Sequence, residues 1–298
     1  MSEKIVTNIL ENNHEKKRYL SRKQIATIFE YLISHYDISK YMKEIYFANI
    51  YYKKNPDTVA QYDLSTKSIL MYEKGLNTYR KIITNDFTYE DKTYKKLFVN
   101  EAILQILIHE LIHVRQIKYL FEKKDYDIEY EILRSSNTSY FIDNDFQLPY
   151  LEEYFGTSVK KYYGKDFRTL KKQVDKLDDM YNRSDSFYDN DPSEINAEYE
   201  SFKEIIYLNE YINPALNEDW KDLLFLQTEA HYTCRKSRVI CPFERFIRKR
   251  NRILTLDSFD FDKYDYFSLP LDKRLSYGLP ISRIEYKEME EYIKSIHL

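Results

Sequence analysis

The chain has 298 residues, 43% of them hydrophobic, which is enough to bury a sizeable core. Its formal net charge of -3 excludes a global electrostatic attraction to nucleic acid or to anionic membranes. The sequence has no uninterrupted apolar stretch of membrane-spanning length, no signal-peptide core, and too few cysteines for a secreted disulfide framework. We therefore expect a cytoplasmic protein that makes no use of a membrane.

Helical and extended patterns alternate along the first ninety residues. The first forty residues have apolar side chains at helical spacing, and Ser21 stands where it would cap a helix. Residues 44–52, 58–63 and 68–72 are short, rich in aromatic and β-branched residues, and separated by turn-forming residues. We interpret them as a small antiparallel sheet, followed by a helix near Tyr79.

The most apolar part of the chain, residues 102–120, predicts a helix that Asn100 caps. Residues 124–167 have no sustained period, which is typical of loop with short helices. The remaining predicted helices cover residues 168–181, 192–208 and 217–232, with a last one that starts at Ser282.

The apolar helix carries the sequence His109-Glu110-Leu111-Ile112-His113. Histidines four residues apart lie one turn apart on one helix face, which is the spacing that a single zinc ion needs, and Glu110 falls within reach of a metal-bound water. Burying these groups in an apolar interior is costly, and a divalent cation would offset that cost. The alternative is a pair of core histidines bonded to carbonyl groups, with Glu110 at the surface.

The third ligand decides the subclass of such a site. A class that places glycine and histidine three and six residues after the second histidine is excluded, because Gln116 and Tyr119 occupy those positions. A later predicted helix offers Glu194 as the ligand, and Glu198, one turn on, could accept a hydrogen bond from a ligand histidine. Glu194 could instead serve as the capping-box partner of Asp191.

These two segments resemble the zincin fold of HExxH metallopeptidases, and in particular the gluzincin branch that contains thermolysin, where a downstream glutamate is the third zinc ligand. The segment from Pro192 to Ala197 also has the Pro-x-Glu-x-x-Ala form found in intracellular zincin-like peptidases of phage and mobile elements. The resemblance covers about residues 44–210.

The resemblance implies an α+β fold, mostly helical, with a small antiparallel sheet before the metal-binding helix. It implies a Zn²⁺-dependent hydrolase of peptide or protein substrates, with Glu110 as general base towards a metal-activated water. His231 is a candidate oxyanion donor, beside Tyr199 and Tyr232. An edge strand of the sheet would bind extended peptide, and residues 58–63 are one candidate. The other candidate strand consists of Ser68, Ile69, Leu70, Met71 and Tyr72.

We expect three parts: a helical segment 1–43, a catalytic domain 44–232, and a basic extension 233–298 packed on the core. Between Arg235 and Arg252 there are eight basic residues and one acid, which could bind nucleic acid or another polyanion or could pair with acidic segments of the chain. Two alternatives to a peptidase therefore stay open: a regulatory, nucleic-acid-associated zincin-like protein, and a catalytically silent zincin scaffold.

Overall fold

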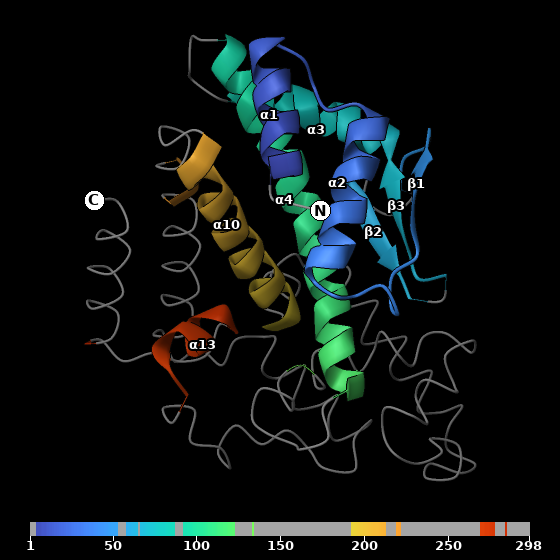
Figure 1. The fold of residues 1–298 in the computed structure, drawn as a ribbon, viewed down its shortest axis with the longest axis vertical. Coiled ribbons are helices and arrows are strands. Elements are labelled where there is room, and N and C mark those ends of the chain that lie inside the picture. The colour runs from blue at the N-terminus through green and yellow to red at the C-terminus, as the bar shows by residue number, and fades with distance from the viewer. Residues whose placement is uncertain are drawn as a thin grey trace. The chain divides into compact units, whose positions relative to one another are not determined.

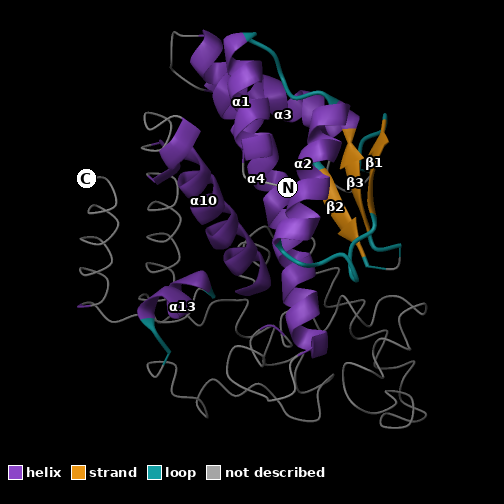
Figure 2. Ribbon diagram, in the orientation of Figure 1, coloured by secondary structure: helices purple, strands orange, loops and turns teal. Residues whose placement is uncertain are grey.

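Helices dominate the computed structural model of the chain, and three strands form one small sheet among them (Figures 1 and 2). The structure describes residues 4–52, 58–64, 66–86, 92–122, 133, 192–212, 219–221, 269–277 and 284. By its contacts the chain divides into two units, residues 1–115 with 200–224 and residues 116–199 with 225–298. The predicted α+β, mostly helical class is confirmed. The predicted domain boundaries stay predictions.

Two helices open the first unit, α1 (Lys4–Glu15) and α2 (Arg22–His35). Ser21 caps α2 as predicted, because its hydroxyl accepts a hydrogen bond from the backbone of Gln24 while the Gln24 side chain accepts one from the backbone of Ser21. The apolar side chains that recur along α2 are buried, and they are Ile25, Ile28, Phe29, Tyr31 and Leu32.

The sheet comprises β1 (Glu44–Ala48), β2 (Ala60–Asp63) and β3 (Ser68–Tyr72) in the order β1-β3-β2. The three strands were predicted, but the sheet is mixed and not purely antiparallel. β2 and β3 pair antiparallel across a short turn, whereas β1 and β3 run parallel. A short turn makes two consecutive strands antiparallel neighbours, as it does for β2 and β3. β1 and β3 are neighbours in the sheet but are not consecutive in the chain, so this rule does not set their direction.

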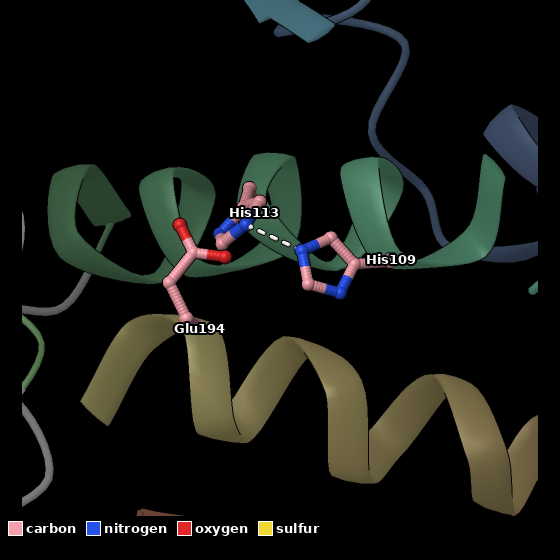
Figure 3. A group of neighbouring side chains, drawn as sticks. All are labelled: His109, His113 and Glu194. Carbon is pink, nitrogen blue, oxygen red and sulfur yellow. Dashed lines mark hydrogen bonds between the residues drawn. The ribbon is translucent and has the colours of Figure 1, made fainter. Parts of the chain in front are cut away.

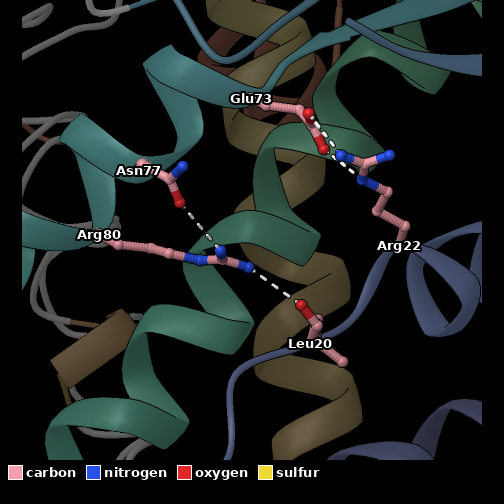
Figure 4. A network of polar contacts seen from close by, with 5 residues as sticks. All are labelled: Leu20, Arg22, Glu73, Asn77 and Arg80. Atoms are coloured by element: carbon pink, nitrogen blue, oxygen red, sulfur yellow. Dashed lines mark hydrogen bonds and ion pairs between the residues drawn. The ribbon is translucent and has the colours of Figure 1, made fainter. Parts of the chain in front are cut away.

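Helix α3 (Glu73–Asp86) follows β3 directly and is tied to the start of α2 (Figure 4). Arg22 forms an ion pair with Glu73. Arg80 donates one hydrogen bond to the carbonyl oxygen of Leu20 at 3.0 Å and another to Asn77. The contacts of Arg22 with Glu73 and of Arg80 with Leu20 connect residues that are 51 and 60 positions apart in the sequence.

Helix α4 (Lys92–Glu122) begins eight residues before the predicted cap, so the assignment of Asn100 as an N-cap is wrong. Asn100 is fully buried inside the helix. Its amide donates to the carbonyl of Arg18 at 3.0 Å and accepts from the backbone of Leu20 at 2.9 Å. A polar residue inside a helix can thus form hydrogen bonds with the backbone of a neighbouring chain segment, and not with the end of its own helix.

Most apolar side chains of α4 are buried, and eleven of the described ones are at most 2% exposed: Leu97, Val99, Ala102, Ile103, Leu104, Leu107, Ile108, Leu111, Ile112, Val114 and Ile117. By length and composition the stretch Lys95–Glu122 could cross a membrane, but 72% of its apolar window is buried inside the protein. That burial is typical of the core helix of a soluble protein. The predicted cytoplasmic location itself stays a prediction.

Helix α10 (Pro192–Ile212) starts at the proline predicted to open it and runs antiparallel to α4. In the first unit, Gln105 donates to the hydroxyl of Ser201 at 2.8 Å, and Asn209 donates to Glu101 at 2.9 Å. In the second unit, Gln116 of α4 contacts the first turn of α10. Both helices are continuous through the two units.

The helix predicted at 168–181 and the loop at 124–167 lie outside the described residues, apart from Leu133. Residues 219–221 are helical, as is Ile284, while the rest of the two helices predicted there is not described. A short helix, α13 (Leu271–Ser276), belongs to the second unit.

Replacing Asn100 by alanine should lower the free energy of unfolding by about 2–4 kcal/mol, because the buried backbone groups of Arg18 and Leu20 would lose their partner. Asn77→Ala, at an exposed position of α3, is the control and should change stability by at most about 0.5 kcal/mol. Urea unfolding of both variants measures the difference, and equal losses would contradict a special role for Asn100.

Glu101 should make stability depend on pH. Burial raises the pKa of Glu101 to about 7, although hydrogen bonds from Asn209 and Trp220 oppose the rise. The unfolded chain loses this proton near pH 4.5 while the folded chain keeps it, so the contribution is complete below pH 4.5 and is lost as the pH rises through 7. It amounts to the order of 3 kcal/mol. Urea unfolding at pH 5 and pH 8 should show a smaller pH dependence in Glu101→Gln, and an unchanged dependence would refute the assignment.

Candidate metal centre

Three side chains from two helices converge at one point of the structure (Figure 3). His109 and His113 project from α4, and Glu194 reaches towards them from the first turn of α10. Each offers one ligand atom, and these atoms lie within 4.8 Å of one another. All three residues are half-buried. The group is therefore close enough to hold a metal ion, as predicted from the sequence.

The two imidazoles face each other through the same ring atom. Their Nε2 atoms are 3.1 Å apart, and the rings meet edge to face at 83°. The two Nε2 atoms are within hydrogen-bonding distance, and the ring tautomers decide which of them donates. A cation placed between the two nitrogens would accept a lone pair from each ring.

The position of Glu194 follows from the way in which α10 meets α4. On one side of the group, Gln105 is bonded to Ser201. On the other side, Gln116 is bonded to the first turn of α10. The first turn of α10, which carries Glu194, thus has its own hydrogen bonds to α4. The competing role of Glu194 as a capping partner involves Asp191, which lies outside the described residues.

Glu110 does not join this group but points to the sheet. Its Oε2 accepts a hydrogen bond from the backbone N–H of Tyr62 in β2 at 2.9 Å. The carboxylate is half-buried, so the alternative that places Glu110 at the surface does not describe this structure. One turn of α4 thus presents imidazoles to α10 and a carboxylate to β2.

That contact lies on the outer edge of the sheet. Tyr72 donates its backbone N–H to Val59, and antiparallel pairs alternate between bonded and non-bonded, so Tyr62 and Ile69 form a non-bonded pair. The N–H and C=O of Tyr62 therefore point away from β3, as do those of Ala60. The bond to Glu110 uses the outward N–H of Tyr62.

The strand of Ser68 to Tyr72 is consequently wrong as an edge strand. β3 is the central strand and pairs on both sides, so its backbone groups are used within the sheet. Of the two strands proposed from the sequence for peptide binding, β2, within 58–63, is at an edge.

Tyr72, which lies near Glu110, was predicted only as part of a candidate peptide-binding strand. Burial raises the pKa of Tyr72, and Tyr52, Glu110 and Asp63 add to the rise. The phenol therefore stays protonated at neutral pH and donates to the side chain of Gln61 at 3.0 Å. Tyr72 lies near Glu110 because β2 pairs with β3, and no local sequence pattern reveals that pairing.

Other predicted site residues are placed only in part. Glu198 lies one turn after Glu194 on α10 and is half-buried, and its role as the partner of a ligand histidine stays a prediction. Tyr199 is also half-buried on α10. His231 and the basic stretch from 235 to 252 lie outside the described residues, so the oxyanion donor and the polyanion partner stay predictions.

Two buried glutamines of α4 were missed as site neighbours. Gln105 stands four residues before His109, and Gln116 stands three residues after His113. Together with Glu101 they continue the line of the histidines along one face of the helix. Polar residues at helical spacing inside an apolar run were a visible signal that this face meets a polar partner.

Comparisons with protein families, with curated proteins and with solved structures found no match to this chain. The metal centre is thus defined by its own geometry.

Glu194→Ala should weaken zinc binding by the order of 100-fold or more, since loss of outer-shell partners alone costs 10- to 100-fold. Glu200→Ala removes the same charge from the same helix six residues further on and should leave the affinity within about threefold. Competition with a chromogenic chelator measures both. Full zinc affinity in Glu194→Ala would refute its assignment as a ligand.

Proposed function

We propose that this protein is a zinc-dependent metallopeptidase. The observation that carries the proposal is the convergence of His109, His113 and Glu194 on one point, with Glu110 on the same helix turn directed at an edge strand. The resemblance of the two motifs to gluzincin-type zincins supports the same function.

The donor set fits zinc. Two imidazole nitrogens and one carboxylate oxygen are a common ligand set of catalytic zinc, which keeps its fourth position open. Zinc bonds of 2.0–2.1 Å in a tetrahedron put two nitrogens about 3.3 Å apart, close to the 3.1 Å between the two Nε2 atoms. The limit of 4.8 Å for the whole group is wider than a closed site, so Glu194 would have to draw nearer by rotation of its side chain.

A non-haem iron site can use the same three ligands. Glu110 favours hydrolysis over iron chemistry, because a carboxylate on the helix turn that carries both histidines can serve as a general base, and oxygen activation at iron does not require one. When bound, zinc would polarise the scissile carbonyl and lower the pKa of a water molecule to about 7.

Glu110 would handle the proton of this reaction. Its Oε2 is held by the N–H of Tyr62, which leaves Oε1 as the oxygen that would accept a proton from water. The same oxygen would then return the proton to the leaving amine of the cleaved peptide bond. The backbone contact fixes the orientation of the carboxylate without adding a charge.

The edge strand supports a peptide as the substrate. The outward N–H and C=O groups of Ala60 lie on the side of β2 where Tyr62 contacts Glu110. An extended peptide can add to such an edge by main-chain hydrogen bonds, which are largely independent of its side chains. A scissile bond held there would lie beside the carboxylate that moves the proton.

Glu110→Gln should keep zinc at one ion per chain but lower peptide cleavage by about 10²–10⁴-fold, which is the usual share of a general base. The amide has the same shape and still accepts the N–H of Tyr62, so the fold should be unaffected. Cleavage of a diverse peptide library, followed by mass spectrometry, measures activity, and elemental analysis measures zinc.

Glu122→Gln, at an exposed position near the end of α4, is the control and should cleave like the wild type. A wild-type protein that binds one zinc ion but cleaves no peptide in the library would refute the peptidase proposal and would favour a catalytically silent scaffold.

A further inference from the structure

A buried amide on α4 contacts the turn that carries the third ligand. Gln116 donates from Nε2 to the carbonyl oxygen of Ser193 at 2.9 Å and to the side-chain oxygen of Asn196 at 2.8 Å. All three residues are at most 8% exposed. One side chain of α4 therefore makes two hydrogen bonds to α10 in the protein interior.

Both acceptors flank Glu194. Ser193 is the residue before it, and Asn196 is two residues after it, in the first turn of a helix that begins at Pro192. The first turn of a helix lacks part of its internal hydrogen bonding and frays readily. Bonds to a backbone carbonyl and to a side chain on either side of Glu194 hold that turn to α4.

We infer that Gln116 is a positioning residue for the metal centre: it holds Glu194 at the distance where the carboxylate can act as third ligand. The inference rests on the metal site of the proposed function but not on peptide hydrolysis. Gln116 stands three residues after His113 on the same helix, so α4 carries two ligands and the residue that would position the third.

The hydrogen bond between Gln105 and Ser201 allows the positioning role of Gln116 to be distinguished from a role in helix packing alone. Gln105 also donates a buried hydrogen bond from α4 to α10, at 2.8 Å to Ser201, but its acceptor is seven residues away from Glu194. Both glutamines should matter for stability. Only Gln116 should matter for the metal, because metal–ligand distances tolerate only about 0.2 Å of error.

The experiment compares Gln116→Met with Gln105→Met, since methionine has a similar length and no hydrogen-bond donor. Urea unfolding of the metal-free proteins should show similar losses of stability. Competition for zinc with a chromogenic chelator should show a 10- to 100-fold weaker affinity for Gln116→Met and a change under about threefold for Gln105→Met.

A double-mutant cycle tests whether Gln116 acts through Glu194. In a Glu194→Ala background, Gln116→Met should weaken zinc binding no further, since the ligand that it positions is already gone. Asn196→Ala removes one acceptor and leaves the other, so it should give an intermediate loss, and it tests the inference if Gln116→Met does not fold.

Equal zinc affinities of Gln116→Met and the wild type would overturn the inference, as would additive effects in the cycle. A wild type that binds zinc and cleaves no peptide would contradict only the peptidase, and these affinities would still decide the role of Gln116. A wild type that binds no zinc would refute both.

Discussion

The antiparallel contact between α4 and α10 is the constraint on which the site depends. Much of α4 is buried, so each of its buried polar side chains needs a partner in the interior to offset its loss of water. α10 supplies such partners to Gln105, Glu101 and Gln116. These bonds set how far one helix is shifted along the other. The ligand atoms of Glu194 and of the two histidines lie within 4.8 Å of one another.

Local patterns were sufficient to predict the parts of this arrangement that one helix can encode. The spacing of His109 and His113 needs only the helical repeat, and the start of α10 at Pro192 needs only the fixed φ of proline. Asn100 shows the limit of such patterns. Asparagine is a residue type typical of helix caps, but the side chain of Asn100 accepts a hydrogen bond from the backbone of Leu20, eighty residues earlier in the sequence.

The sheet shows the same limit in a different way. Its strands were predicted because alternation and β-branched residues are local signals. Strand order is not local, and β3 enters between two strands that precede it in the chain. The wrong choice of Ser68 to Tyr72 as an edge followed from that, and so did the missed contact between Glu110 and Tyr62.

The ligands are far apart in the sequence, and this separation links the cation to folding. Gln116 and Ser193, which are joined by a hydrogen bond, are 77 positions apart. A cation bound there would act as a cross-link across a long loop, and it would bind the native state far better than the unfolded chain. A free ion concentration one hundred times the dissociation constant would then add about 2.7 kcal/mol to the native state. The resistance of this protein to heat and to digestion would thus report on the metal supply of its surroundings.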